Sequence, residues 1–134
     1  MVCGFTLHDE FWITNGTAIR TVTAVNGMVS NHQRSISSLP GPFFDGVCKT
    51  FRHGKVDKTW MCFAREGTNL CQSFDGLNFV TEAKTRYNRN AIRLGNYRGA
   101  PIAIGGLESL KTEVFKKKSD RWTLTADFPF ASDS

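Results

Sequence analysis

The side chains that could carry acid–base or nucleophilic chemistry are few and scattered along this chain of 134 residues. The histidines stand at His8, His32 and His53, each far from the others in the sequence. No histidine–carboxylate pair frames a serine or a cysteine as a nucleophile, which needs its base within hydrogen-bond reach. We therefore predict a protein that is not an enzyme and that holds no cofactor or metal.

The four cysteines, Cys3, Cys48, Cys62 and Cys71, form no C-x-x-C pair, so we expect no zinc site. Cys62 and Cys71 flank a predicted turn and would lie opposite each other on paired strands, where a disulfide can form. Two buried free thiols are the alternative. A bridge would indicate an extracellular protein, and free thiols a cytoplasmic one. Cys3 and Cys48 could form a second pair.

The formal net charge is +5, and the whole excess lies in residues 41–134. The one run of like charge, Lys116-Lys117-Lys118, is closely followed by Asp120. A nucleic-acid-binding surface would gather its charge in a patch with aromatic residues between. Lysines on a hairpin tip or a sheet edge more often protect against aggregation. We therefore expect no nucleic-acid partner, and no membrane partner either, since no apolar stretch approaches the roughly 18 residues that span a bilayer.

The elements that must position these residues are strands. Apolar and polar residues alternate with a period of two, and no segment keeps helical spacing for three turns. Glycine, Asp-Gly and proline separate the alternating segments, as tight turns require. The predicted strands are 17–25, 44–51, 59–64, 69–74, 77–82, 90–97, 101–104, 111–117 and 121–126. The sequence therefore predicts an all-β fold.

The strands from residue 44 onward fall into two groups of four with the same layout. Phe79 and Trp122, which occupy the fourth strand of each group, are 43 residues apart. The turns at Leu39-Pro40 and Phe128-Pro129 are 89 residues apart, which is about two such repeats. Four strands in every 40–50 residues or so is the spacing of β-propeller blades.

The second group contains an apolar strand that ends in two glycines, Ile102–Gly106, then Phe115 and, after six further residues, Trp122. This pattern resembles the kelch repeat, although that family more often has tyrosine in place of Phe115. The resemblance implies a four-stranded antiparallel blade of a kelch-type β-propeller. In such a blade the glycines let backbones approach closely, and the aromatic pair fills the wedge between neighbouring blades.

The first group departs from this pattern. Phe63-Ala64 stands in place of the glycine pair, and Phe74 and Phe79 have only four residues between them. We interpret residues 43–85 as a degenerate propeller blade and residues 86–134 as a kelch-like blade. Residues 1–42 are an N-terminal strand region, interpreted as a remnant of a preceding blade.

Two or three blades form an incomplete kelch-type propeller, because the smallest propellers have about four blades. The apolar faces at both ends must then be covered by the remaining blades of a longer protein or by self-association. We expect a fragment of a longer kelch-repeat protein.

Propellers generally bind through the loops on one face, which join second to third strands and one blade to the next. Here these loops are 65–69, 84–90 and 107–110, and the middle one carries three cations and a tyrosine. Arginine and tyrosine are common anchors of protein interfaces. The candidate binding residues are Arg65, Arg86, Tyr87, Asn88, Arg89 and Glu108. We predict a non-catalytic module that binds a protein partner, with an acidic protein as the first expectation.

The alternative is a partial propeller enzyme or carbohydrate-active domain, galactose-oxidase-like or sialidase-like. Copper oxidases among the kelch propellers hold their metal with tyrosine and histidine, and here no histidine stands beside Tyr87 or Tyr97. Residues 73–79 resemble the Asp-box hairpin of sialidase-like propellers but lack one residue and its tryptophan. We interpret that segment as a turn.

Overall fold

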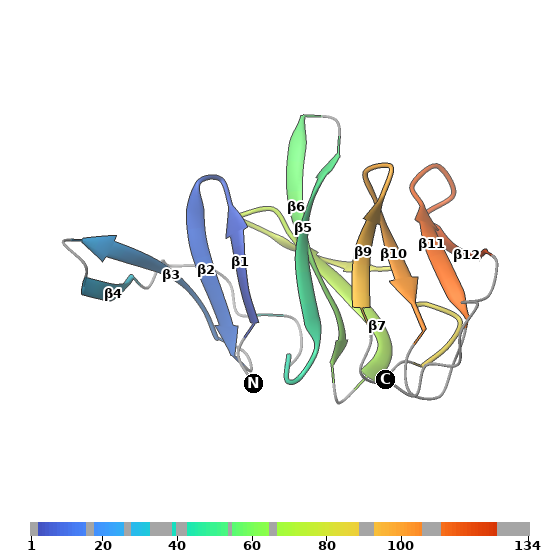
Figure 1. Ribbon diagram of the computed structural model, residues 1–134, viewed down its shortest axis with the longest axis horizontal. Coiled ribbons are helices and arrows are strands. Elements are labelled where there is room, and N and C mark those ends of the chain that lie inside the picture. The colour runs from blue at the N-terminus through green and yellow to red at the C-terminus, as the bar shows by residue number, and fades with distance from the viewer. Residues whose placement is uncertain are drawn as a thin grey trace.

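A computed structural model describes residues 3–15, 18–25, 28–32, 39, 43–53, 55–64, 67–88, 93–105 and 111–125. Within these residues the chain forms twelve strands and no helix. The strands make three four-stranded antiparallel sheets, each with its strands in chain order (Figure 1). The described part of the chain thus contains no helix that could cross a membrane.

The first sheet consists of β1 (Cys3–Leu7), β2 (Glu10–Asn15), β3 (Ala18–Val25) and β4 (Met28–His32). The second consists of β5 (Val47–His53), β6 (Val56–Ala64), β7 (Gly67–Phe74) and β8 (Phe79–Glu82). The third consists of β9 (Arg93–Tyr97), β10 (Ala100–Ile104), β11 (Thr112–Lys116) and β12 (Arg121–Leu124). The prediction of an all-β fold built from four-stranded antiparallel blades is confirmed.

The first sheet is more complete than the sequence suggested, since only 17–25 was predicted as a strand there. The turn between β1 and β2 is made by His8 and Asp9, which both adopt left-handed backbone conformations (φ 53° and 60°). Hairpin turns of this kind usually carry asparagine or glycine. Without those residues the turn left no signal in the sequence, and the two short strands beside it were missed.

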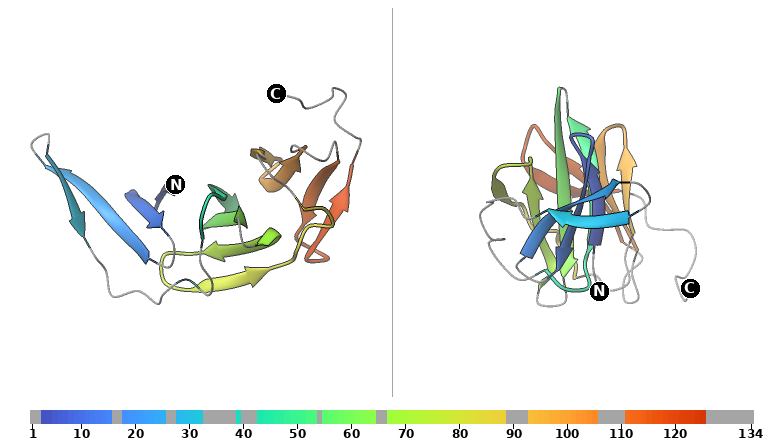
Figure 2. Two further views of the ribbon diagram at one scale, coloured as in Figure 1. Left: turned by 90° about the horizontal axis from the view of Figure 1, so that it is seen from below. Right: turned by 90° about the vertical axis from the view of Figure 1, so that its left-hand side faces the viewer.

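The sheets stand side by side in an arc, with the first strand of each on the inner side (Figure 2). β1 packs against β5, and β5 packs against β9. Later strands lie farther out, so each sheet faces the next across a wedge-shaped space. We call the space between the first and second sheets the first junction, and the space between the second and third sheets the second junction.

Each junction is filled by its own apolar cluster. The first junction contains Phe5, Leu7, Trp12, Ile19, Leu39, Phe43, Met61 and Phe74. The second contains Phe51, Trp60, Cys62, Phe63, Cys71, Ala103, Phe115 and Trp122. Strand β6 serves both clusters, because successive side chains of a strand point to opposite faces: Met61 belongs to the first junction and its neighbours Trp60 and Cys62 to the second.

The two junctions repeat one aromatic arrangement. In the first, Trp12 on β2 packs edge-on against Phe74, with ring centroids 5.2 Å apart, and Phe74 stacks on its cross-strand partner Phe79. In the second, Trp60 on β6 packs against Phe115 at 4.7 Å and against Trp122 at 5.9 Å. Phe115 and Trp122 are again cross-strand partners.

The repeat also holds where the sequence departs from it. Gly105, the first residue of the predicted glycine pair, has a left-handed backbone with φ of 62°. Phe63, which stands in its place in the second sheet, has φ of 61° although it is not glycine. Such a conformation is strained for a bulky residue, and burial of the Phe63 ring in the second junction offsets that strain.

All four cysteines lie in pairs at disulfide distance. Cys62 and Cys71 are direct partners on β6 and β7, with Cα atoms 4.2 Å apart. Cys3 and Cys48, with Cα atoms 6.2 Å apart, join β1 to β5 and therefore the first sheet to the second. Both pairings considered from the sequence are thus present.

Candidate functional site

The predicted binding loop between the second and third sheets is described as far as Asn88. Arg86, Tyr87 and Asn88 are all exposed there. Arg65, Arg89 and Glu108 lie outside the described residues, and their predicted roles stay predictions.

Thr85 fastens this loop to the second sheet. It is buried, and its backbone N–H donates to the Asn69 carbonyl on β7 at 3.1 Å. The Asn69 side-chain amide in turn donates to the Thr85 carbonyl at 3.5 Å. The Thr85 hydroxyl donates to the carbonyl of Tyr87 at 2.9 Å, which folds the loop back over itself.

Glu113 and Trp122 fasten the same loop to the third sheet. The Glu113 carboxylate on β11 is fully buried and accepts a hydrogen bond from the Arg86 backbone N–H at 2.8 Å. The Trp122 indole N–H donates to the carbonyl of Ala83 at 2.9 Å. A buried carboxylate is costly unless it is hydrogen-bonded, so these contacts hold the loop backbone in one place.

Sequence reasoning did not find Thr85 or Glu113, and it assigned Trp122 to packing between blades alone. Glu113 stands in the middle of a correctly predicted strand, between Thr112 and Val114. An ionisable residue on a face expected to be buried is itself a signal that it has a specific partner. The identity of that partner, a backbone amide 27 residues earlier in the chain, follows only from the packing of the two sheets.

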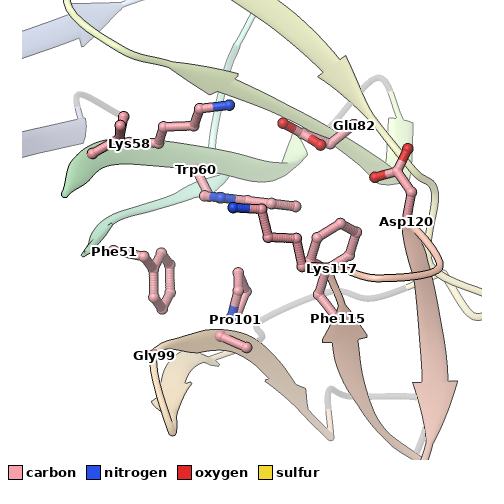
Figure 3. Close-up of a pocket in the computed structure, with 11 residues that line it drawn as sticks. Phe51, Lys58, Trp60, Glu82, Gly99, Pro101, Phe115, Lys117 and Asp120 are labelled. Atoms are coloured by element: carbon pink, nitrogen blue, oxygen red, sulfur yellow. The ribbon is translucent and has the colours of Figure 1, made fainter. Parts of the chain in front are cut away.

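A pocket of about 390 Å³ opens at the other end of the second junction (Figure 3). It lies near the turns of the β5–β6, β9–β10 and β11–β12 hairpins, which share the upper edge in Figure 1. One lining residue, Glu82, is the last residue of β8 and directly precedes the 83–88 loop. The residues that line the pocket are Phe51, Val56, Lys58, Trp60, Glu82, Gly99, Ala100, Pro101, Phe115, Lys117 and Asp120.

The pocket combines an aromatic floor with a charged rim of both signs. Trp60 and Phe115 are buried at its base. Lys58 and Lys117 supply two positive charges, and Glu82 and Asp120 supply two negative ones. Glu82 accepts a hydrogen bond from the buried Ser73 hydroxyl at 2.6 Å, which orients its carboxylate.

The indole N–H groups of the three tryptophans differ in whether a described residue accepts a hydrogen bond from them. Trp12 donates to the Leu7 carbonyl at 3.2 Å, and Trp122 donates to Ala83. Trp60 is 5% exposed and lines the pocket, and no residue in the described segments accepts a hydrogen bond from its N–H. In an open pocket such a donor is available to water or to a ligand.

The hairpins beside the two junctions differ in length. On β1–β2 the pair Phe5–Trp12 is followed by two further pairs before the turn, whereas on β5–β6 the pair Lys49–Trp60 is followed by four. Two extra residues extend a strand by about 7 Å. The longer hairpin therefore rises past its tryptophan and forms one wall of the pocket.

The β7–β8 turn, which resembles an Asp box, is a structural turn. The Asp75 carboxylate accepts hydrogen bonds from the backbone N–H groups of Asn78 at 2.7 Å and Leu77 at 2.8 Å. Burial alone would raise the pKa of Asp75, but these two bonds and the charge of Lys58 outweigh it and lower the pKa below its ordinary value. The His8 ring nitrogen lies 2.8 Å from the Asp75 carbonyl, so the turn is part of the first junction.

No group of three or more metal-ligating side chains occurs in the segments that the structure describes. Tyr87 and Tyr97 are both exposed, and the Arg98 guanidinium lies over the Tyr97 ring at 5.3 Å. The prediction of a protein without metal or catalytic activity stays a prediction.

Comparison with known proteins adds information on the fold alone. No protein-family model matches the chain, and no curated protein matches it by sequence. A solved structure described as "Structure of YjhT" is similar, with a TM-score of 0.71 and 10% sequence identity over 96% of this chain. The match covers 52% of that structure, so this chain spans about half of its length.

Proposed function

We propose that this chain is a non-catalytic binding module, part of a longer kelch-type propeller, which holds a protein partner through the loop at 84–88. The match to about half of a longer solved structure supports the incomplete propeller. The remaining blades, or a second copy of the chain, would cover the outer faces of the first and third sheets.

The observation that carries this proposal is that the 84–88 loop is hydrogen-bonded to both the second and the third sheet. Its backbone is held through Asn69 on one side and through Glu113 on the other. The side chains of Arg86, Tyr87 and Asn88 are left exposed. A loop that is ordered before binding loses little further conformational entropy in a complex.

The chemistry of the exposed side chains indicates an acidic partner. Arginine pairs with carboxylates through two parallel hydrogen bonds. Tyrosine adds a large contact area at a low cost in side-chain entropy. Lys84 is also exposed on the same loop and contributes a further positive charge.

Selection from a displayed random-peptide library tests the proposal. We expect enrichment of peptides rich in Asp and Glu, with binding of the selected peptides reduced at least about tenfold by the double substitution Arg86→Ala/Tyr87→Ala. Lys118→Ala is the matched control, because Lys118 is exposed on the β11–β12 turn, at the other end of the strands.

Two results would overturn the proposal. One is a selection that yields no acidic peptides. The other is binding that the double substitution leaves unchanged, or that Lys118→Ala weakens as much, since either places the contact away from this loop.

A further inference from the structure

The pocket in the second junction is a candidate site that shares no residue with the 84–88 loop, although Glu82, which lines the pocket, stands two residues before that loop. Its volume of about 390 Å³ is within the range of small-molecule sites, roughly 300–1,000 Å³. A ligand there would contact side chains of both sheets, including Trp60 on β6 and Phe115 on β11.

The groups at the base of the pocket favour a ligand that carries a hydrogen-bond acceptor. The Trp60 N–H is the buried donor that no described residue satisfies. In the view of Figure 3 the Lys117 side chain runs across the Trp60 indole, and both line the pocket. A carboxylate is the acceptor that best suits a neutral N–H beside an ammonium group, since charge-assisted hydrogen bonds are the stronger ones.

The carboxylates on the opposite part of the rim favour a ligand that carries a positively charged hydrogen-bond donor. The carboxylates of Glu82 and Asp120 lie on the right of Figure 3, away from the Lys117 nitrogen. Within the described residues, neither carboxylate forms an ion pair with Lys58 or Lys117. Ion-pairing capacity of both signs is therefore left over on the rim.

The remaining lining is apolar. Phe51, Val56 and Pro101 come from β5, β6 and β10 and contribute no charged group. Val56 is 49% exposed. A ligand with an apolar side chain would cover part of this surface and gain by its removal from water.

We propose that this pocket binds a small zwitterion of the amino-acid kind, with one carboxylate, one ammonium group and an apolar side chain. The carboxylate accepts hydrogen bonds from the Trp60 N–H and Lys117. The ammonium group pairs with Glu82 and Asp120, and the apolar side chain lies against Phe51, Val56 and Pro101. A free amino acid and a short peptide share this chemistry.

Isothermal titration calorimetry with L-leucine and leucyl-leucine tests the ligand class and distinguishes the two sources. We expect saturable binding of at least one of them. Blocking the carboxylate of that compound as its amide, or its amino group by N-acetylation, should weaken binding at least about tenfold each, because each change removes a charge-assisted interaction. No saturable binding of either compound, or equal binding of a blocked derivative, would overturn the proposal.

Substitutions locate the site. Lys117→Met keeps the aliphatic chain and removes the positive charge. Asp120→Asn keeps the shape of the side chain and removes the negative charge, and asparagine tolerates the left-handed backbone at that position (φ 53°). Each should weaken binding by about tenfold, whereas Lys118→Met, an exposed neighbour that does not line the pocket, should leave it unchanged.

These variants separate loss of binding from loss of folding, because Lys117 and Asp120 are both exposed turn residues whose substitution leaves the buried clusters intact. Thermal unfolding of each variant checks that it is folded. Folded Lys117→Met and Asp120→Asn proteins that bind as tightly as the unmodified chain would overturn the site. Failure of the peptide selection at the 84–88 loop would leave this outcome untouched, so the two proposals can fail separately.

Discussion

The two junctions use the same aromatic arrangement and differ in how they are closed. In the first, the cysteine pair Cys3–Cys48 links β1 to β5, and the Thr50 hydroxyl donates to the Thr6 carbonyl at 2.7 Å. His8 lies against the β7–β8 turn. The second junction has an open pocket at one end and an exposed, fastened loop at the other. The described contacts at the first junction link its two sheets, whereas the pocket at the second is lined by charged groups of both signs.

The largest expected effect comes from the link across the first junction. Cys3 and Cys48 are 45 residues apart and Cys62 and Cys71 only 9, so a bridge between the former restricts the unfolded chain more. Chain-entropy reasoning gives about 4 kcal/mol for the longer loop and about 2.6 kcal/mol for the shorter. We expect Cys3→Ser/Cys48→Ser to lower the free energy of unfolding more than Cys62→Ser/Cys71→Ser does.

Urea unfolding of the two double variants measures this difference, and mass spectrometry without reductant checks that both bridges form in the unmodified chain. Equal losses, or a larger loss for the Cys62/Cys71 variant, would contradict the larger contribution expected of the link across the first junction.

The next largest effect is a difference in lost stability between substitutions of Trp12 on β2 and Trp60 on β6. Trp12→Phe removes a hydrogen bond to the Leu7 carbonyl and should destabilise the protein by about 1–2 kcal/mol beyond the loss of ring area. Trp60→Phe removes an N–H that no described residue satisfies, so its polar contribution should be close to zero without ligand. Free energies of unfolding in urea give the comparison, and a larger polar cost at Trp60 would show that its N–H already has a partner.

Backbone strain at the left-handed positions near the ends of β6 and β10 makes a smaller contribution, which loss of a buried ring can outweigh. Gly105→Ala should cost about 1 kcal/mol, because a Cβ atom is strained at φ of 62°. Phe63→Gly relieves the same strain but removes a buried ring, which costs about 3–5 kcal/mol for deletions to alanine. Phe63→Gly should therefore still destabilise, and a stabilised variant in thermal unfolding would show that the ring contributes little to the second junction.

The smallest effect is a pH dependence of the first junction. The pKa of Asp75 is lowered in the folded chain, despite burial, by its two backbone hydrogen bonds and Lys58. The stability that this carboxylate contributes is present above its unfolded pKa, about 3.9, and is lost as the pH falls through the lowered folded value. Asp75→Asn should reduce this loss in thermal unfolding between neutral and acid pH, and an unchanged acid sensitivity would place its origin elsewhere.

Much of the second and third sheets could be predicted because each strand carries its own signal. Alternation and turn residues marked the strands, and the spacing of Phe115 and Trp122 identified an aromatic pair that packs at a junction. The β1–β2 hairpin could not be found, because His8 and Asp9 form its turn without glycine. The degenerate appearance of residues 43–85 was partly a matter of hairpin length, since Phe74 and Phe79 are cross-strand partners just as Phe115 and Trp122 are.

The site was only partly predictable, for a physical reason. Exposed loop residues such as Arg86 and Tyr87 can be proposed from composition and position alone. The support from Glu113 and the pocket beside Trp60 arise from contacts between strands of different sheets. Such contacts depend on the relative lengths of hairpins that are distant in the sequence, and local patterns do not report them.

Hydrogen exchange at the three indole N–H groups, followed by NMR, tests the difference between the junctions most directly. Trp→Phe variants at each position assign the signals. We predict slow exchange for Trp12 and Trp122, whose N–H groups are hydrogen-bonded, and faster exchange for Trp60, whose N–H lines the open pocket. A Trp60 signal as protected as that of Trp12 would contradict the open second junction.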